Sequence, residues 1–271
     1  MRIRTAFMAP LLLCSMSCAT SPTGRHQLHL VSPQDAAQAG IRSYTQLRAH
    51  TPIDSDPAVN AYAACVVHAI TSAVGPPYGG GSWQVTVFKQ DQTVNAFALP
   101  GGKVAVYTGI FKVAKSAGEL AAVLGHEIGH VQAGHGAERM SDQMAAQAGI
   151  DIVAVLTGID QSTPGGQATM SALGMGTQVG VLLPFSRAQE SEADELGLRY
   201  MAEAGFDPRE ALQLWRNMMQ ANLGTPPQIL SDHPSDANRL SDLQNRLPDA
   251  LQRYAAAERQ GRHPECRPPA P

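Results

Sequence analysis

Apolar and polar residues alternate along three short stretches in the first half of the chain, at 83–89, 94–99 and 103–108. A period of two residues of this kind predicts β-strands. Pro100-Gly101-Gly102 separates the last two stretches and is typical of a tight turn. We therefore expect 94–99 and 103–108 to pair as a hairpin within a small sheet.

Helical patterns lie on both sides of these strands. Capping residues and prolines mark several of their starts, and glycines mark several of their ends. The expected helices cover 32–47, 58–74, a segment around 120–135, 137–157, 168–183, 187–204, 208–219, 235–247 and 249–259. Helices, a small sheet and further helices in this order predict an α+β fold that is mainly helical.

The helix around 120–135 carries His126-Glu127-Ile128-Gly129-His130, an H-E-x-x-H motif. Four residues advance a helix by about 400°, so both imidazoles lie on one face, one turn apart. Two such neutral imidazoles can hold one Zn²⁺ and leave room for a third ligand and a water. Glu127 can take a proton from that water and pass it to a leaving amine. The motif predicts metal-assisted hydrolysis, with peptide bonds as the favoured substrate.

The alternative for this motif is a surface helix with two solvated histidines. Its apolar flanks, which include Leu120, Leu124 and Ile128, instead predict a buried helix. Buried histidines and a buried glutamate need partners, which a metal and its ligands would provide. Ser116 and Glu119 also form a capping-box pattern that begins the helix shortly before the motif.

Two candidates compete for the third ligand position. His135 is nine residues after the first motif histidine, about 180° around a continuous helix, so it is expected to face away as a cap, a surface residue or a neighbour of a ligand. Glu190 and Asp194 share one helix face, so Glu190 can bind zinc while Asp194 hydrogen-bonds a ligand imidazole. Glu192 lies off that face and is expected to be solvated. An acidic amphipathic helix without a site is the alternative.

Composition narrows the classes of partner. Only 16% of the residues are charged and 5% are aromatic, with a formal net charge of −3. A nucleic-acid surface requires a basic stripe, and base stacking requires exposed aromatic side chains. We therefore expect no nucleic-acid partner.

Residues 1–17 are expected to be a signal peptide, because arginines precede the apolar run 6–13 and small residues follow it. A cysteine directly after Ser17 predicts lipoprotein processing, with Cys18 as the lipidated first residue of the mature chain. Cys14 competes for that role, and an ordinary cleaved signal is the alternative. Lipidation would attach the exported protein to a membrane.

Export places the mature chain in a compartment that permits disulfides. Cys65 and Cys266 remain after processing at residue 18, so one bridge between them is expected. A buried thiol at Cys65 with a free Cys266 is the alternative. The predicted division of the mature chain is a linker at 18–31, one domain at 32–260 and an extended tail at 261–271.

Several motifs in this order resemble the HtpX/CAAX-prenyl-endopeptidase family of gluzincins, and within it the exported lipoprotein-type members. The matching pieces are Thr23-Gly24-Arg25, the stretch from Asn95 to Gly102, the His126–His130 motif, the segment from Glu190 to Asp194, and His233-Pro234 with Arg239. Together they extend over most of the mature chain. The resemblance implies a zincin-like metallopeptidase domain with the small sheet beside the H-E-x-x-H helix.

The resemblance also implies roles for single residues. One Zn²⁺ per chain would be bound by His126, His130 and Glu190, with Glu127 as the general base and acid and Asp194 supporting a ligand. His233 and Arg239 would steady the oxyanion of the tetrahedral intermediate. In some relatives the equivalent histidine instead caps the zinc and keeps the enzyme latent. The strand formed by Asn95, Ala96, Phe97 and Ala98 would hold an extended substrate by backbone pairing.

Family members of this kind degrade misfolded or misassembled outer-membrane proteins. The resemblance therefore implies a lipoprotein on the periplasmic side of the outer membrane, or a soluble periplasmic protein, whose partners are unfolded or misassembled envelope proteins. A chaperone-like or scaffold lipoprotein that binds unfolded chains with little turnover is an alternative, and a hydrolase of cell-wall peptides is a weaker one. Glu127 favours the enzyme, because a binding protein would not need that carboxylate.

Overall fold

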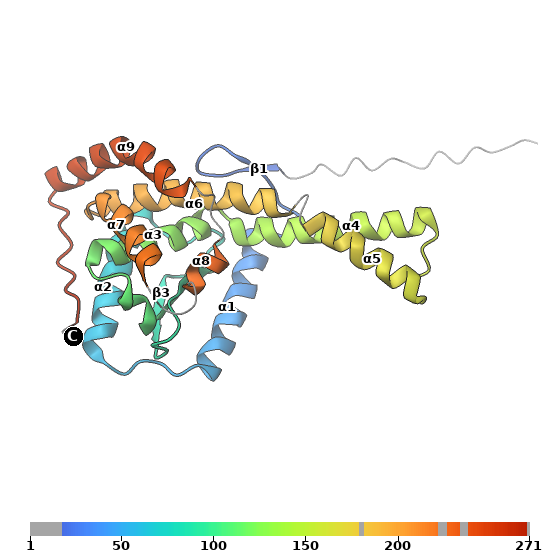
Figure 1. The fold of residues 1–271 in the computed structure, drawn as a ribbon. Coiled ribbons are helices and arrows are strands. Elements are labelled where there is room, and N and C mark those ends of the chain that lie inside the picture. The colour runs from blue at the N-terminus through green and yellow to red at the C-terminus, as the bar shows by residue number, and fades with distance from the viewer. Residues whose placement is uncertain (1–17, 179–181, 222–226, 234–237, 270–271) are drawn as a thin grey trace, which may run out of the picture.

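The computed structural model describes residues 18–178, 182–221, 227–233 and 238–269. Most of them are helical, and a small sheet lies among the helices (Figure 1). The predicted class, mainly helical α+β with a small sheet, is confirmed. The predicted signal peptide, Cys14 and Pro234 lie outside the described residues, so signal processing stays a prediction.

The small sheet consists of β3 (Gln84–Phe88), β4 (Ala96–Leu99) and β5 (Lys103–Tyr107). Its strand order is β3-β5-β4, with β4 antiparallel and β3 parallel to β5. The predicted hairpin between the last two strands is therefore confirmed. Because β4 forms an edge of the sheet and packs against α3 (Ala117–Gln132), one strand edge lies beside the H-E-x-x-H helix.

The start of α3 follows the predicted capping pattern. The Ser116 hydroxyl accepts a hydrogen bond from the Glu119 N–H at 3.1 Å, and the Glu119 carboxylate accepts one from the Lys115 N–H at 2.5 Å. The first bond satisfies a backbone donor that the first helical turn leaves without a partner, and the second satisfies the N–H of the residue before the cap. The cap thus fixes where the helix begins and so which face carries the motif.

Helix α3 packs closely along α6 (Leu183–Glu203), and small residues make this approach possible. A Cβ atom at Gly125 would lie 2.8 Å from the carbonyl oxygen of Gly197, and one at Gly197 would lie 2.7 Å from the backbone nitrogen of His126. Any larger side chain at either glycine would push the helices apart. The close crossing brings the acidic segment of α6 next to the motif histidines.

The other helices surround this pair. They are α1 (Pro33–His50), α2 (Pro57–Val74), the 3₁₀ helix η1 (Thr108–Lys112), α4 (His135–Thr157), α5 (Pro164–Thr177), α7 (Arg209–Gln220), α8 (Gln228–Asp232) and α9 (Arg239–Arg259). In Figure 1, α9 runs along the outer side of α6, and the α4–α5 hairpin projects from the body. By length and composition α2 could span a membrane, but Ala63, Val66 and Ile70 on this helix are fully buried in the core.

Both ends of the chain contain structure that the sequence patterns did not predict. Within the predicted linker at 18–31, β1 (Cys18–Thr20) and β2 (His26–Leu28) pair as an antiparallel hairpin. The hairpin docks because Arg25 between its strands pairs with buried carboxylates on the body. The two terminal helices expected at 235–247 and 249–259 form the single helix α9 with Pro248 inside it. Packing of α9 on α6 offsets the backbone hydrogen bond that proline lacks.

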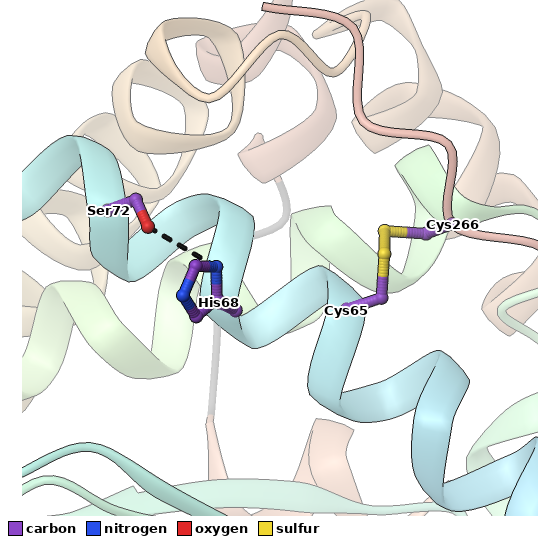
Figure 2. The surroundings of a disulfide bond; sticks show 4 residues. All are labelled: Cys65, His68, Ser72 and Cys266. Carbon is purple, nitrogen blue, oxygen red and sulfur yellow. Dashed lines mark hydrogen bonds between the residues drawn. A yellow bond between two sulfur atoms is a disulfide. The ribbon is translucent and has the colours of Figure 1, made fainter.

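A disulfide joins Cys65 on α2 to Cys266 in the extended C-terminal tail, as Figure 2 shows. The two cysteines are 201 residues apart in the sequence, so the bond closes a loop that contains most of the chain. Such a long loop restricts the unfolded chain strongly. The bond also fixes the tail against the body at a helix whose other face lies in the core.

Replacing both cysteines, as in Cys65→Ser with Cys266→Ser, should lower the free energy of unfolding by about 2–5 kcal/mol. Urea unfolding of the purified chain measures this difference. Adding a reductant should destabilise the wild type by a similar amount and leave the double variant unchanged. Equal unfolding midpoints for the two proteins would show that the bond contributes nothing to stability.

Candidate metal site

The two motif histidines face each other from successive turns of α3. Nε2 of His126 lies 3.0 Å from Nε2 of His130, and both side chains are buried. Two lone pairs at this distance repel unless a proton or a cation lies between the nitrogens. The predicted placement of both imidazoles on one helix face is confirmed by this geometry.

Glu190 of α6 meets both histidines. Its Oε2 lies 3.3 Å from Nε2 of His126, and its Oε1 lies 3.4 Å from Nε2 of His130. His233, which directly follows α8, adds a fourth donor: its Nδ1 is 3.3 Å from His126 Nε2 and 3.0 Å from Glu190 Oε2. These four buried residues form one group whose ligand atoms all lie within 4.8 Å of one another.

The spacing of this donor set fits a small metal ion. Tetrahedral bonds of about 2.0–2.1 Å place the ligand atoms about 3.3–3.4 Å apart. The measured separations of His126 Nε2 from Glu190 and His233, 3.3 Å each, agree with this value. Imidazole nitrogens with one carboxylate are also a common donor set for first-row divalent metals. The residues present therefore suit a metal: His126, His130 and Glu190 would hold it, and His233 lies where a fourth ligand would be.

Burial and neighbouring charges act in opposite directions on this cluster. Burial lowers the pKa of His130 well below its ordinary value, which keeps the imidazole neutral, as a metal ligand must be. Burial alone would do the same at His126, but bonding to Asp194 and Glu190 raises its pKa to about 9. Burial opposes ionisation of Glu190, yet hydrogen bonds from the three histidines hold its pKa far below the usual range. The cluster therefore favours a positive charge at its centre.

Glu127 is 2% exposed and lies between the cluster and the edge strand. Its Oε2 accepts a hydrogen bond of 3.3 Å from the N–H of Ala98 on β4. Its Oε1 lies 3.3 Å from Nε2 of His233 but has no hydrogen-bond partner among the described residues. A carboxylate oxygen buried without a donor is ready to accept a proton or a water molecule.

Asp194 and Arg239 support His126 from behind. Asp194 Oδ1 lies 2.9 Å from His126 Nδ1 and accepts a 2.5 Å hydrogen bond from the Arg239 guanidinium. The guanidinium also packs 4.1 Å from the ring centroid of Trp215. Asp194 thus hydrogen-bonds a ligand imidazole, as its shared helix face with Glu190 predicted. The oxyanion role of Arg239 stays a prediction, because in this structure its donors bond to Asp194 and to the His233 carbonyl.

The short helix α8, which no sequence pattern predicted, lies over the start of the edge strand. The Asn95 side chain donates to Asp232 at 2.8 Å, and the Ile229 N–H donates to the Val94 carbonyl at 3.3 Å. These bonds place the next residue, His233, against the cluster. The substrate-binding role of Asn95–Ala98 stays a prediction. The contacts show that α8 covers the beginning of this strand.

His135 neighbours a candidate ligand, which was one of its three expected roles, but it does not face away from the site as a continuous helix would require, and Glu192 is not solvated as expected. Helix α3 ends at Gln132 and α4 begins at His135 after Gly134, whose φ of 70° breaks the helix. His135 therefore turns back to the site and is 1% exposed, with its Nδ1 2.7 Å from Nδ1 of His130. Glu192 is 5% exposed instead of solvated and lies 3.1 Å from His135. Gly134, a common helix-stop signal, could have indicated the break.

A buried His-His-Glu cluster on two crossing helices, with a glutamate beside the first histidine, defines a metallopeptidase centre of the H-E-x-x-H type. The comparison with protein families agrees: residues 57–247 match peptidase family M48, and the chain belongs to this family. The predicted metalloprotease class is therefore confirmed. The HtpX/CAAX branch and the lipoprotein subgroup stay predictions.

Curated relatives include two kinds of named protease. The chain is 39% identical over 170 residues to the mitochondrial metalloendopeptidase OMA1 of Schizosaccharomyces pombe. The aligned residues make up 62% of this chain and 48% of that protein. It is 37% identical over 189 residues to OMA1 of Arabidopsis thaliana, covering 69% and 36%. It is 32% identical over 217 residues to the beta-barrel assembly-enhancing protease of Escherichia coli K12, covering 77% and 43%. The chain thus matches less than half the length of each of these three relatives.

Proposed function

We propose that this protein is an exported zinc metalloendopeptidase that hydrolyses peptide bonds of misfolded or misassembled envelope proteins. The observation that carries the proposal is the position of Glu127. Its carboxylate is buried beside the four-residue cluster, and it also contacts the edge strand at Ala98. Only a hydrolase needs a proton acceptor between a metal site and a peptide-binding edge.

The chain's own residues divide the chemistry as follows. His126, His130 and Glu190 would hold Zn²⁺, which supplies Lewis acidity toward water and the scissile carbonyl. Glu127 accepts a proton from the attacking water and delivers it to the nitrogen of the leaving amine. Asp194 keeps the proton of His126 on Nδ1, which leaves Nε2 free to bind. The low-dielectric surroundings strengthen each of these interactions.

The edge strand sets the class of substrate. An extended peptide can add to β4 by backbone hydrogen bonds, whereas most backbone N–H and C=O groups of a folded protein are already paired. Unfolded or misassembled chains therefore fit this site best. The beta-barrel assembly-enhancing proteases among the relatives support envelope proteins as substrates. We further propose that the mature chain begins at Cys18 and is anchored by lipid on the periplasmic side of the outer membrane.

The test is cleavage of one outer-membrane β-barrel protein in two states by the purified, zinc-loaded chain. We expect the urea-unfolded form to be cut after dilution, and the form folded in detergent to persist. Mass spectrometry of the products identifies hydrolysed peptide bonds. Stable binding of the unfolded form without any cleavage would contradict the protease and favour the scaffold alternative.

His233→Ala should raise the cleavage rate by about tenfold or more. His233 completes the four-residue cluster and lies 3.3 Å from Glu127, so it occupies the space where the attacking water must lie. The wild type can cleave only in the minor state in which His233 has left the cluster. If this state makes up about 0.1–10% of the molecules, the cleavage rate is reduced to that fraction. Initial rates on the unfolded substrate measure the effect. Gln228→Ala, an exposed change on α8, is the matched control and should have no effect. A lower rate for His233→Ala would instead support the oxyanion role.

A further inference from the structure

The side of His130 that points away from the cluster meets a second buried group. His130 Nδ1 lies 2.7 Å from Nδ1 of His135, and His135 Nε2 lies 3.1 Å from Oε2 of Glu192. Both partners are almost fully buried, so water does not compete for these contacts. Side chains from α3, α4 and α6 thus form a hydrogen-bonded line that ends at a candidate metal ligand.

The direction of each hydrogen bond follows from the two ends of this line. A histidine that binds a metal through Nε2 carries its proton on Nδ1, so the Nδ1–H of His130 is the donor. Nδ1 of His135 must then accept, which places the proton of His135 on Nε2. That N–H donates to Glu192, and an ionised carboxylate can only accept. One arrangement of protons satisfies all three groups.

The N-terminal hairpin fixes Glu192 in this line. The Thr23 hydroxyl donates to Glu192 Oε1 at 2.6 Å, and Nε of Arg25 donates to Oε2 at 2.8 Å. The other guanidinium nitrogens of Arg25 donate to both carboxylate oxygens of Glu138 at 2.5 and 2.6 Å. The Thr23-Gly24-Arg25 motif, which the proposed chemistry does not use, therefore holds the outer end of the line.

We propose that His135 is a positioning residue of the metal site. Its Nδ1 accepts a hydrogen bond from the Nδ1–H of His130, and Glu192 selects the tautomer of His135 that can accept this bond. The two motif histidines would then be oriented by different means, His126 directly by a carboxylate and His130 through an interposed imidazole. The inference rests on the proposed function in that it requires a metal on this cluster.

The first test compares zinc affinities by competition with a chromophoric chelator. His135→Leu, which removes the acceptor, should weaken zinc binding by about 10–100-fold. His135→Asn should restore most of the affinity, because its amide oxygen can accept the same hydrogen bond from His130. His68→Leu is the control: His68 is an exposed histidine on α2 bonded to Ser72 (Figure 2), and its loss should change nothing. Unchanged affinity in His135→Leu would overturn the inference.

The second test does not depend on any variant folding. In the zinc-loaded wild type, ¹⁵N-resolved NMR of the imidazoles should show a proton on Nδ1 of His130 and on Nε2 of His135, with Nδ1 of His135 unprotonated. A proton on Nδ1 of His135 would overturn the inference. Cleavage is measured on the same sample. Zinc binding with these tautomers but no hydrolysis would contradict the proposed protease and leave the role of His135 intact.

Discussion

Glu127→Gln should reduce cleavage of an unfolded substrate by about 10²–10⁴-fold, the usual contribution of a general acid–base. The glutamine keeps the size of the side chain and can still accept the hydrogen bond from the Ala98 N–H through its amide oxygen. It cannot take a proton from water or return one to the leaving amine. The substitution therefore removes the proposed chemistry while disturbing the buried surroundings little.

Zinc content decides how this result is interpreted. Glu127 is not part of the four-residue cluster, so the variant should bind zinc as tightly as the wild type. Glu119→Gln is a matched control on the same helix, because Glu119 is buried at the N-terminus of α3, away from the cluster. It should retain activity in the fraction that folds. Full activity in zinc-loaded Glu127→Gln would show that another group moves the proton.

The sequence predicted those parts of the site that depend on local periodicity. His126 and His130 share a helix face because four residues make about one turn, and Glu190 and Asp194 share another for the same reason. The capping residue Ser116 and the turn at Pro100-Gly101-Gly102 also follow local rules. Each of these predictions concerns residues that are close in sequence, where backbone geometry alone fixes the arrangement.

The features that the sequence missed depend on tertiary packing. Its position on the helix predicts that Glu192 is a solvated acid. The docked hairpin makes its burial favourable, because Arg25 pairs with the carboxylate. On a continuous helix His135 would face away from the site, but the helix breaks at Gly134, so His135 faces the site. The parallel pairing of β3 with β5 likewise joins strands separated by β4 in the sequence. No single-sequence pattern states which distant segments will meet.

Removing the metal should abolish cleavage and also destabilise the fold. Without a cation, only buried imidazoles can compensate the negative charge of Glu190. His126 Nε2 then also faces His130 Nε2 at 3.0 Å, where their lone pairs repel unless a proton lies between them. A ligand that binds only the native state stabilises it by about 2.7 kcal/mol when its free concentration is 100 times its dissociation constant. Dialysis against a chelator, followed by urea unfolding with and without added Zn²⁺, measures this difference.

Variants separate the structural from the chemical effect of the metal. Glu127→Gln should keep the full stabilisation by zinc, because its side chain changes the proton acceptor and not the donor set. Glu190→Gln should lose most of it, since a neutral amide replaces the one carboxylate among the four clustered residues. Mg²⁺ should not substitute, because it prefers oxygen ligands in octahedral geometry. Equal stability with and without zinc, or undiminished cleavage after chelation, would show that this cluster does not hold a functional metal.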